Sequence, residues 1–452
     1  MKRHLKDLSL GKYQNVKIVF LLGIGIGIIL FTIGPIAYTR FPKKISFQLP
    51  SLDAKVNEYS TSVGSKDGDV IEDSTSLASK DVIKNSTSLG SKDGEVMEES
   101  TSVGSNGKCD IFVGEWIPDS NAPYYTNETC WAIHEHQNCM KYGRPDMDFL
   151  KWKWKPDGCE LPIFDPNQFL ELVRGKTLAF IGDSVGRNHM QSLICLLSKV
   201  ESPVQVAKSE KKKYIRWKYR NHNFTIEGFW SPFLVKAREV DSKDPALASL
   251  CDVYLDKIDK SWTTKMEKFD YVIIASGHWF FRPLIYYENG QVLGCHKCVD
   301  KNMTVVQRNY AYRKTVQTVF RAINNAKNFK GIAFLRTFAP SHFEGGLWDM
   351  GGNCVRTSPF TRNETRLDGS NLELYMIQQE EFRVAEREGK EKGRKFRLLD
   401  TTKSTLMRPD GHPSRYGHWP NENITWSDCL HWCLPGPIDT WNNLLLEMLK
   451  RE

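Results

Sequence analysis

The chain has 452 residues, and its 62 lysine and arginine side chains exceed its 54 aspartate and glutamate side chains, for a formal net charge of +8. At roughly 100–200 residues per domain, this length allows two or three folded units. The basic residues are dispersed and no nucleic-acid-binding motif accompanies them, so we expect no nucleic-acid partner. Eleven cysteines are more than a reducing compartment usually favours, and they predict disulfides formed in an oxidising lumen.

Residues 1–17 are basic, and residues 18–37, which follow, contain no charged side chain. A helix over 18–37 would cover about 30 Å, which is the thickness of a bilayer core. A cleaved signal peptide is the alternative, but its apolar region should be shorter and should end at a small-x-small site. We therefore predict a cytosolic tail over 1–17, a transmembrane signal anchor over 18–37 and a lumenal remainder, because a positive flank favours the cytosol.

Residues 38–108 are predicted to form a disordered lumenal stem. A polar unit that opens with Ser-Thr-Ser recurs at Ser60, Ser74, Ser86 and Ser100. These units lack aromatic residues and are too short and polar to bury a face, which favours disorder over a solenoid.

Residues 109–165 are rich in cysteine and tryptophan, and this change in composition predicts an irregular subdomain held by disulfides.

From residue 166 onward, short apolar runs alternate with helical patterns. The expected strands are Leu178–Ile181, Tyr271–Ser276, Gly331–Phe338 and Phe396–Asp400. The expected helices are Val185–Ser198, Tyr312–Ala326 and Leu372–Glu391. This alternation predicts an α/β fold with a three-layer parallel sheet, and ligands bind such sheets beyond the carboxyl ends of the strands.

The stretch Thr177–Ser198 carries the clearest chemistry, because it reads as a buried strand, a Gly-Asp-Ser turn and a helix. Ser184 follows the strand, beside helix N–H groups that have no intrahelical partner. That position suits a nucleophile whose intermediate is an oxyanion, although a simple helix cap is an equal alternative. A nucleophilic serine needs a base and a group that orients it, and Asp428 and His431 could supply both from one loop.

A Gly-Asp-Ser early in an α/β pattern and an Asp-x-x-His near the C-terminus resemble the SGNH/GDSL esterase superfamily. The longer motifs CMKYGRPD, FIGDSVGRNHMQSL, GHWFFRP, LMRPDGHPSRYGHWP and DCLHWCLPGPIDTWNNLL resemble the plant trichome birefringence-like family. Members of that family O-acetylate cell-wall polysaccharides in the Golgi. The resemblance runs from about Cys109 to the C-terminus and is nearest to the xyloglucan and mannan O-acetyltransferases.

This resemblance implies a GDSL/SGNH-like acyltransferase domain over residues 166–452. In it, Ser184 is the nucleophile, His431 the general base and acid, and Asp428 the residue that orients His431. SGNH enzymes also use a glycine and an asparagine from separate blocks, but Ala275–Trp279 has no asparagine at the expected place. The remaining candidates for oxyanion or substrate contacts are Asn188, Arg187, Gly228, Gly277, His278 and Trp279. The implied disulfides are Cys109–Cys159, Cys130–Cys195, Cys139–Cys433 and Cys354–Cys429.

The resemblance also implies a single-pass type II protein of the Golgi membrane with its catalytic domain in the lumen. We expect the acceptor to be a hemicellulose, first the side-chain galactose of xyloglucan, then glucomannan and then xylan. No bound cofactor is expected; the acetyl donor would be acetyl-CoA or would come from a membrane protein that supplies it. A polysaccharide acetyl-esterase with the same triad and a non-enzymatic polysaccharide-binding protein are the alternatives.

Two further patterns concern metals and glycans. Cys295 and Cys298 have the spacing of half a zinc site, but no second pair completes it, so we expect no metal. Six Asn-x-Ser/Thr sequons predict glycosylation in a lumen. They are Asn85, Asn127, Asn223, Asn302, Asn363 and Asn423.

Overall fold

The computed structural model describes residues 109–211, 213–240, 249–422 and 424–452. The predicted tail, anchor and stem lie outside these residues, as do the sequons Asn85 and Asn423. Among the described residues, no helix is both long enough and apolar enough to cross a membrane.

The secondary structure follows the alternation expected from residue 166 onward and adds strands to it. The strands are β1 (Gly114–Pro118), β2 (Trp152–Pro156), β3 (Thr177–Gly182), β4 (Val204–Lys208), β5 (Tyr214–Tyr219), β6 (Phe224–Trp230), β7 (Val235–Glu239), β8 (Cys251–Ile258), β9 (Tyr271–Ala275), β10 (Leu284–Glu288), β11 (Gln291–His296), β12 (Ile332–Arg336) and β13 (Lys395–Leu399). The α-helices are α2 (Pro166–Leu172), α3 (Ser184–Leu197), α4 (Lys260–Thr263), α5 (Arg308–Asn325), α6 (Gly369–Glu391), α7 (Thr402–Leu406) and α8 (Asp439–Leu449).

A seven-stranded sheet in the order β13-β12-β9-β3-β6-β5-β4 forms the centre of the fold. The strands from β13 to β6 in this order pair in parallel, and they include all four strands expected from the sequence. Strand β5 runs antiparallel to both β4 and β6, so the prediction of a wholly parallel sheet was wrong. The edge strand β4 buries none of its residues, and it therefore lacks the apolar pattern that announces a strand.

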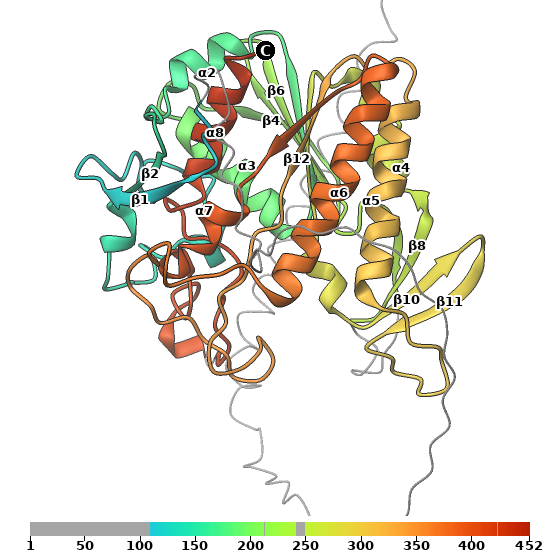
Figure 1. Ribbon diagram of the computed structural model, residues 1–452. Coiled ribbons are helices and arrows are strands. Elements are labelled where there is room, and N and C mark those ends of the chain that lie inside the picture. Colours follow the sequence, from blue (N-terminus) through green and yellow to red (C-terminus); the bar gives the residue numbers. More distant parts are fainter. Residues whose placement is uncertain (1–108, 212, 241–248, 423) are drawn as a thin grey trace, which may run out of the picture. The chain divides into compact units, whose positions relative to one another are not determined.

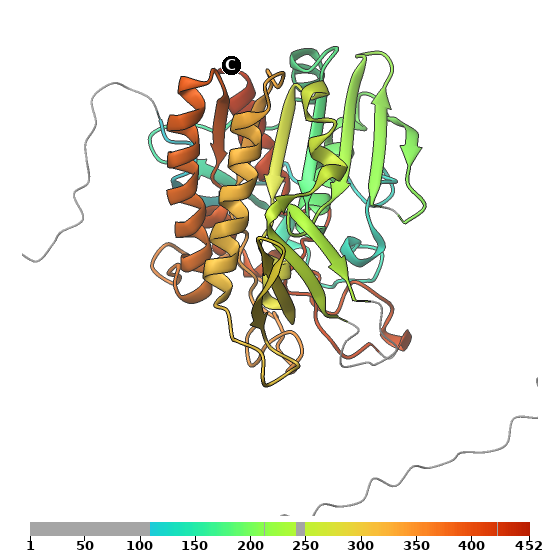
Figure 2. The ribbon, with the colours of Figure 1, turned by 90° about the vertical axis from the view of Figure 1, so that its right-hand side faces the viewer.

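Helices cover both faces of this sheet (Figure 1). Helices α5 and α6 pack against each other on one face, and Figure 2 shows them side by side. Helices α3, α8 and α2 form the layer on the other face, where α3 contacts both α2 and α8. The three helices expected from the sequence are present with somewhat different ends, so the three-layer arrangement is confirmed.

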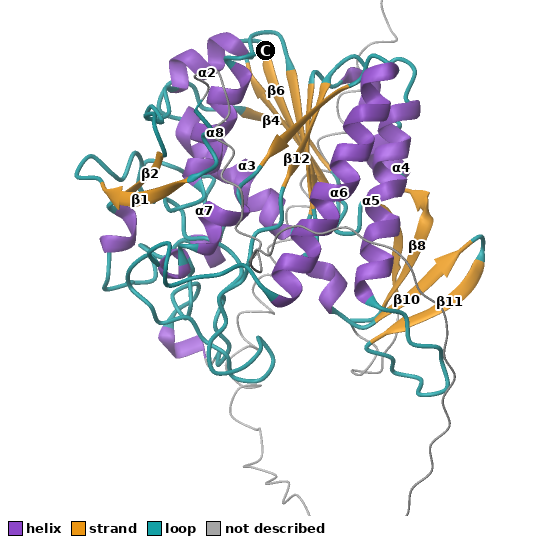
Figure 3. Cartoon of the chain, in the orientation of Figure 1, coloured by secondary structure: helices purple, strands orange, loops and turns teal. Residues whose placement is uncertain are grey.

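Two smaller sheets were not predicted. Strands β11, β10, β8 and β7 form a four-stranded sheet in that order. In the region expected to be irregular, β1 and β2 pair antiparallel and bring Trp116 opposite Trp154, with ring centroids 5.7 Å apart. The indole of Trp116 also donates to the carbonyl of Ser404, 2.8 Å away. In Figure 3, loops with a few short helical turns occupy much of the lower left of the view.

The end of β3 is closely packed against β9. A β-carbon on Gly182 would lie 1.8 Å from the carbonyl oxygen of Ala275, which belongs to the neighbouring strand. By contrast, a β-carbon on Gly186, one helical turn later, would meet nothing closer than 3.9 Å. Only a residue without a side chain therefore allows β3 and β9 to approach at this point.

We predict that Gly182→Ala lowers the free energy of unfolding by about 3 kcal/mol or more, because a backbone carbonyl cannot move aside for the new methyl group. Gly186→Ala is the matched control and should leave stability unchanged or raise it by up to about 1 kcal/mol, since alanine favours the helix. Denaturant unfolding of both variants measures the difference. Equal stabilities would contradict this account of the β3–β9 contact.

Candidate active site

Ser184 lies where β3 gives way to α3. Asp183 caps the helix, since its carboxylate accepts the N–H groups of Val185 (3.0 Å) and Gly186 (3.4 Å). The N–H of Arg187 donates to the Asp183 carbonyl at 3.1 Å. Among the described residues, the N–H of Ser184 itself has no hydrogen-bond partner. The first turn of α3 thus leaves one backbone donor free at the serine, at the positive end of the helix dipole.

The three residues expected to form a catalytic triad come together in the structure. The hydroxyl of Ser184 donates to Nε2 of His431 over 2.6 Å. Nδ1 of His431 lies 2.8 Å from Oδ2 of Asp428, which fixes the tautomer with Nδ1 as the donor. The other carboxylate oxygen of Asp428 accepts the N–H groups of Leu430 (3.1 Å) and His431 (2.9 Å). This is the arrangement that activates a serine for acyl transfer.

The electrostatics of the pair favour an ionised Asp428. Burial alone would raise the pKa of Asp428, but the charge and hydrogen bonds of His431 outweigh burial and lower it to about 2. Burial opposes a charged imidazole in the same way, yet Asp428 outweighs it and raises the pKa of His431 above its ordinary value of 6.5. The carboxylate therefore makes His431 a stronger base toward the Ser184 proton.

The segment Asp428–Cys433 is anchored on both sides of His431. Disulfides join Cys429 to Cys354 and Cys433 to Cys139, so one staple lies on each side of the histidine. Between them, the N–H of Trp432 donates to the side-chain oxygen of Asn188 at 2.8 Å. We name this segment, Asp428–Cys433, the catalytic loop.

Asn188 therefore acts differently from the sequence prediction. Its side chain is fully buried, and its amide nitrogen lies 3.4 Å from the Trp432 carbonyl, so both ends of the amide face the catalytic loop. The prediction of Asn188 as an oxyanion donor was therefore wrong, because a fully buried amide that is hydrogen-bonded to the backbone cannot reach a substrate. It instead connects α3, which carries Ser184, to the loop that carries His431.

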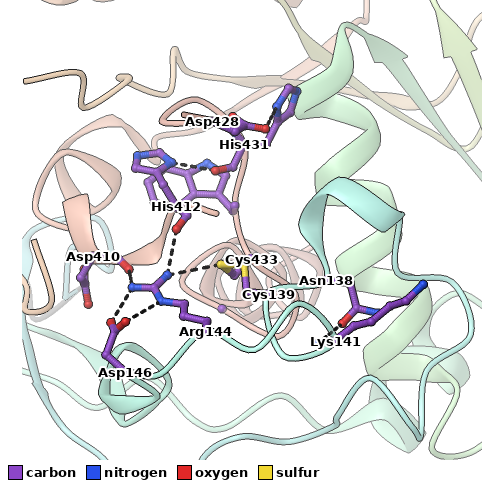
Figure 4. Close-up of a disulfide and its surroundings, with 12 residues drawn as sticks. Asn138, Cys139, Lys141, Arg144, Asp146, Asp410, His412, Asp428, His431 and Cys433 are labelled. Carbon is purple, nitrogen blue, oxygen red and sulfur yellow. Dashed lines mark hydrogen bonds and ion pairs between the residues drawn. A yellow bond between two sulfur atoms is a disulfide. The ribbon is translucent and has the colours of Figure 1, made fainter. Parts of the chain in front are cut away.

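Arg144 of the N-terminal region reaches the segment beneath the catalytic loop (Figure 4). Its guanidinium donates to the carbonyls of His412 (2.8 Å) and Asp410 (2.6 Å) and forms a fork with Asp146. His412 in turn donates from Nδ1 to the carbonyl of His431 at 2.7 Å. Sequence reasoning missed this brace, although the Arg-Pro-Asp repeated in CMKYGRPD and LMRPDGHP was a visible sign of it.

All four disulfides expected from the family resemblance are present: Cys109–Cys159, Cys130–Cys195, Cys139–Cys433 and Cys354–Cys429. Cys295 and Cys298, which resembled half a zinc site, form a fifth disulfide with each other. Cys251, which is buried, is the cysteine left free.

Gly228 and His278 have defined contacts near the start of α3. Gly228 pairs with Phe180 inside the sheet and lines the small cavity beside Asp183 and Arg187, and its part in an oxyanion hole stays a prediction. His278 lies 2.8 Å from the carbonyl of Ala339 and 3.4 Å from Asp183, and it orients the helix cap. Its contacts, together with Arg336, lower the pKa of Asp183, although burial acts to raise it.

Gly277, Arg187 and Trp279 also have defined places. Gly277 has φ +158° and directly precedes the short 3-10 helix His278–Phe281, and a β-carbon on it would lie 2.6 Å from the ring of Phe338, so only glycine fits there. The Arg187 guanidinium stands 5.1 Å from the ring centroid of Trp230, and burial lowers its pKa. Trp279 packs edge-on against the same Trp230, with centroids 5.3 Å apart. Trp230, which the sequence did not single out, therefore connects two of the candidates.

The described sequons differ in exposure. Asn223, Asn302 and Asn363 are exposed, and Asn127 is half-buried. Glycosylation at these positions stays a prediction.

Residues 161–448 match the family described as "GDSL/SGNH-like Acyl-Esterase family found in Pmr5 and Cas1p", and residues 107–160 match the "PMR5 N terminal Domain". The protein named trichome birefringence-like 19 of Arabidopsis thaliana is 59% identical over 351 residues, covering 77% of this chain and 82% of that protein. The chain belongs to the trichome birefringence-like family. Xyloglucan O-acetyltransferase 4 of Populus trichocarpa is 45% identical over 346 residues (76% and 81% coverage). Xyloglucan O-acetyltransferase 2 of Arabidopsis thaliana is 42% identical over 347 residues (76% and 83%).

The raised pKa of His431 predicts the pH dependence of the site. His431 must be neutral to accept the Ser184 proton, so the rate should rise with pH through a midpoint above 6.5. Asp428→Asn removes the charge that raises this pKa. The midpoint should then move to lower pH, and the plateau rate should fall by on the order of 10³–10⁴-fold, because the imidazole loses its orienting acceptor. Hydrolysis of a neutral aryl acetate measured across pH tests both effects, and an unmoved midpoint would count against them.

The disulfides that anchor the catalytic loop lead to a separate prediction. Replacing Cys354 and Cys429 by serine opens a cross-link between residues 75 apart and should lower stability by about 2–5 kcal/mol. It should also lower kcat at temperatures where the variant stays folded, because residue 429 lies between Asp428 and His431. Cys295→Ser with Cys298→Ser is the control, since that disulfide closes a separation of only 3 and stabilises less. Aryl acetate turnover and thermal unfolding, measured together, should separate the two double variants.

Proposed function

We propose that the protein is an O-acetyltransferase that moves an acetyl group through an acetyl-serine at Ser184 onto a hydroxyl of a cell-wall polysaccharide. The observation that carries this proposal is the 2.6 Å hydrogen bond from the Ser184 hydroxyl to His431, with Asp428 behind the imidazole. The names of two relatives, both xyloglucan O-acetyltransferases, support acetyl transfer to xyloglucan. Its side-chain galactose is our first acceptor, before glucomannan and xylan.

The reaction has two displacements. In the first, His431 takes the Ser184 proton while Oγ attacks the carbonyl carbon of the donor, and the leaving group departs with that proton. In the second, His431 takes the proton of a sugar hydroxyl, whose oxygen attacks the acetyl-serine, and Ser184 recovers its proton. The free N–H of Ser184 at the start of α3 stands ready to stabilise the oxyanion in both steps.

A polysaccharide acetyl-esterase is the second candidate function. The family description names acyl-esterases, and water can replace the sugar hydroxyl in the second displacement without any change to the triad. A binding protein without catalytic activity would leave the Ser184–His431–Asp428 arrangement without a purpose. The charged tail and apolar stretch at residues 1–37 support a type II membrane protein with its catalytic domain in the lumen. The Golgi membrane as its location is proposed from the family resemblance alone.

The acetyl-serine gives the direct test. The wild-type protein, mixed with a labelled acetyl donor and no acceptor, should carry one acetyl group on the peptide that contains Ser184, as measured by mass spectrometry. Ser184→Ala should lose this label and lower turnover by on the order of 10³-fold or more. Ser198→Ala, at the other end of α3, is the matched control and should keep both. Persistence of the label in Ser184→Ala would refute the mechanism.

A panel of deacetylated wall oligosaccharides then separates transfer from hydrolysis. Transfer predicts labelled xyloglucan oligosaccharide, whereas the esterase function predicts release of acetate from acetylated polymer and no labelling of the bare one.

A further inference from the structure

A groove of about 840 Å³ lies over β7 and the start of α4. Its inner end is formed by Trp230 and Trp279, which stand edge to face. Trp230 pairs with Gly182 at the end of β3, and the N–H of Ser231 donates to the Gly182 carbonyl at 2.9 Å. Trp230 also lines the small cavity beside Asp183 and Arg187. The groove therefore begins at the edge of the sheet from which Ser184 projects.

Four lysines line this groove: Lys213, Lys236, Lys257 and Lys260. All four are exposed, and within the described part of the chain none of them forms an ion pair. The ammonium groups of Lys236 and Lys257 stand 4.6 and 5.6 Å from the ring centroid of Tyr254, so one ring holds both. Among the described residues, no ion pair neutralises these four cations.

The carboxylates of the groove do not offset this charge fully. Asp259 accepts from the Ser231 hydroxyl (2.6 Å) and from the Ser261 N–H (2.8 Å), which fixes it as the cap of α4. Asp256 accepts the N–H of Asn289 at 3.0 Å. The third carboxylate, Glu239, belongs to the far end of β7. The lysines between these groups remain available to an anion.

The ligand that fits such a groove combines negative charge with length. Strand β7, which lines the groove, spans about 13 Å from Val235 to Glu239, so a ligand that fills the groove must be extended. Lysine ammonium groups bind phosphates as point charges. A neutral sugar chain would gain little binding energy from four lysine side chains. The charge of the groove therefore favours an anionic donor over a neutral acceptor as its ligand.

We infer that this groove binds the phosphate-bearing carrier of the acyl donor, a thioester of the acetyl-CoA type, with its acetyl end at Trp230 and Ser184. The inference rests on the proposed acetyl transfer and on the acetyl-CoA donor that the family resemblance implies, and it adds the site that would bind this donor. In the step it serves, Oγ of Ser184 forms a bond to the carbonyl carbon and the carbon–sulfur bond breaks. The serine proton passes through His431 to the departing sulfur, which leaves as the free thiol.

The test compares two donors with the same acetyl group on the full chain. Acetyl-CoA carries the phosphates, and p-nitrophenyl acetate is neutral. Lys236→Glu with Lys257→Glu should lower the ratio of kcat/KM for acetyl-CoA to that for the neutral ester by on the order of tenfold or more. Lys199→Glu, at the far end of α3 from Ser184, is the matched control and should leave the ratio unchanged. Added salt should lower the ratio of the wild type as well.

Binding without turnover gives the second measurement. Coenzyme A titrated into the full-length Ser184→Ala protein should bind, and the two lysine changes should weaken that binding by a similar factor. Lys213→Glu with Lys260→Glu is a second pair from other elements, for use if the first pair unfolds. Absence of coenzyme A binding, an equal effect of Lys199→Glu, or a loss confined to neutral xyloglucan oligosaccharides would each overturn the inference.

These outcomes stay distinct from failure of the proposed function. If Ser184→Ala still hydrolyses the neutral ester at the wild-type rate, the triad mechanism fails whatever the groove binds. If coenzyme A binds through the lysines but no sugar is ever acetylated, the acyltransferase assignment fails and the anion site stands.

Discussion

The hydrogen bond between Ser184 and His431 joins side chains 247 residues apart, and the rest of the site depends on it. A single hydrogen bond contributes only about 1 kcal/mol to stability. Closing a flexible loop of that length costs on the order of 5 kcal/mol in chain entropy. This hydrogen bond therefore cannot hold the catalytic loop in position, and other contacts must bring Ser184 and His431 together. The two disulfides and the amide of Asn188 provide these contacts and leave the serine and histidine free for chemistry.

The same reasoning explains why the N-terminal region cannot be treated as a separate module. One apolar core contains Trp116 and Trp154 of that region together with Leu193 of α3 and Trp441 of α8. Arg144 extends the connection to the backbone beneath the catalytic loop, and a disulfide from Cys139 completes it. Residues 109–165 therefore fold together with the domain that follows them, since they share its core and brace the active site.

The sequence could predict the parts of the site that rest on local patterns. The apolar run before Gly182 and the helical spacing after Ser184 identify β3 and α3, and the short spacing of Asp428 and His431 allows them to meet. It could not predict contacts that depend on distant packing. Asn188 looked like an oxyanion donor because of its place one turn after Ser184, yet tertiary structure uses it to hold Trp432. Likewise, β4 buries none of its residues, and pairing with β5 alone defines it as a strand.

The choice between transfer and hydrolysis cannot reside in the triad. The His431 side chain is 23% exposed, so water can reach the imidazole that would activate a sugar hydroxyl. In the proposed mechanism, water and the sugar hydroxyl compete for the same acetyl-serine, and the sugar hydroxyl reacts faster only where binding gives it a high effective concentration. Specificity must therefore come from residues that hold the acceptor against this edge of the sheet. If the lysine-lined groove binds an anionic donor, the groove is vacated when the carrier departs. A neutral acceptor gains no electrostatic attraction from the lysines and would not be drawn into the groove. The polysaccharide should consequently approach Ser184 from a direction other than the groove, which makes donor and acceptor sites separable by substitution.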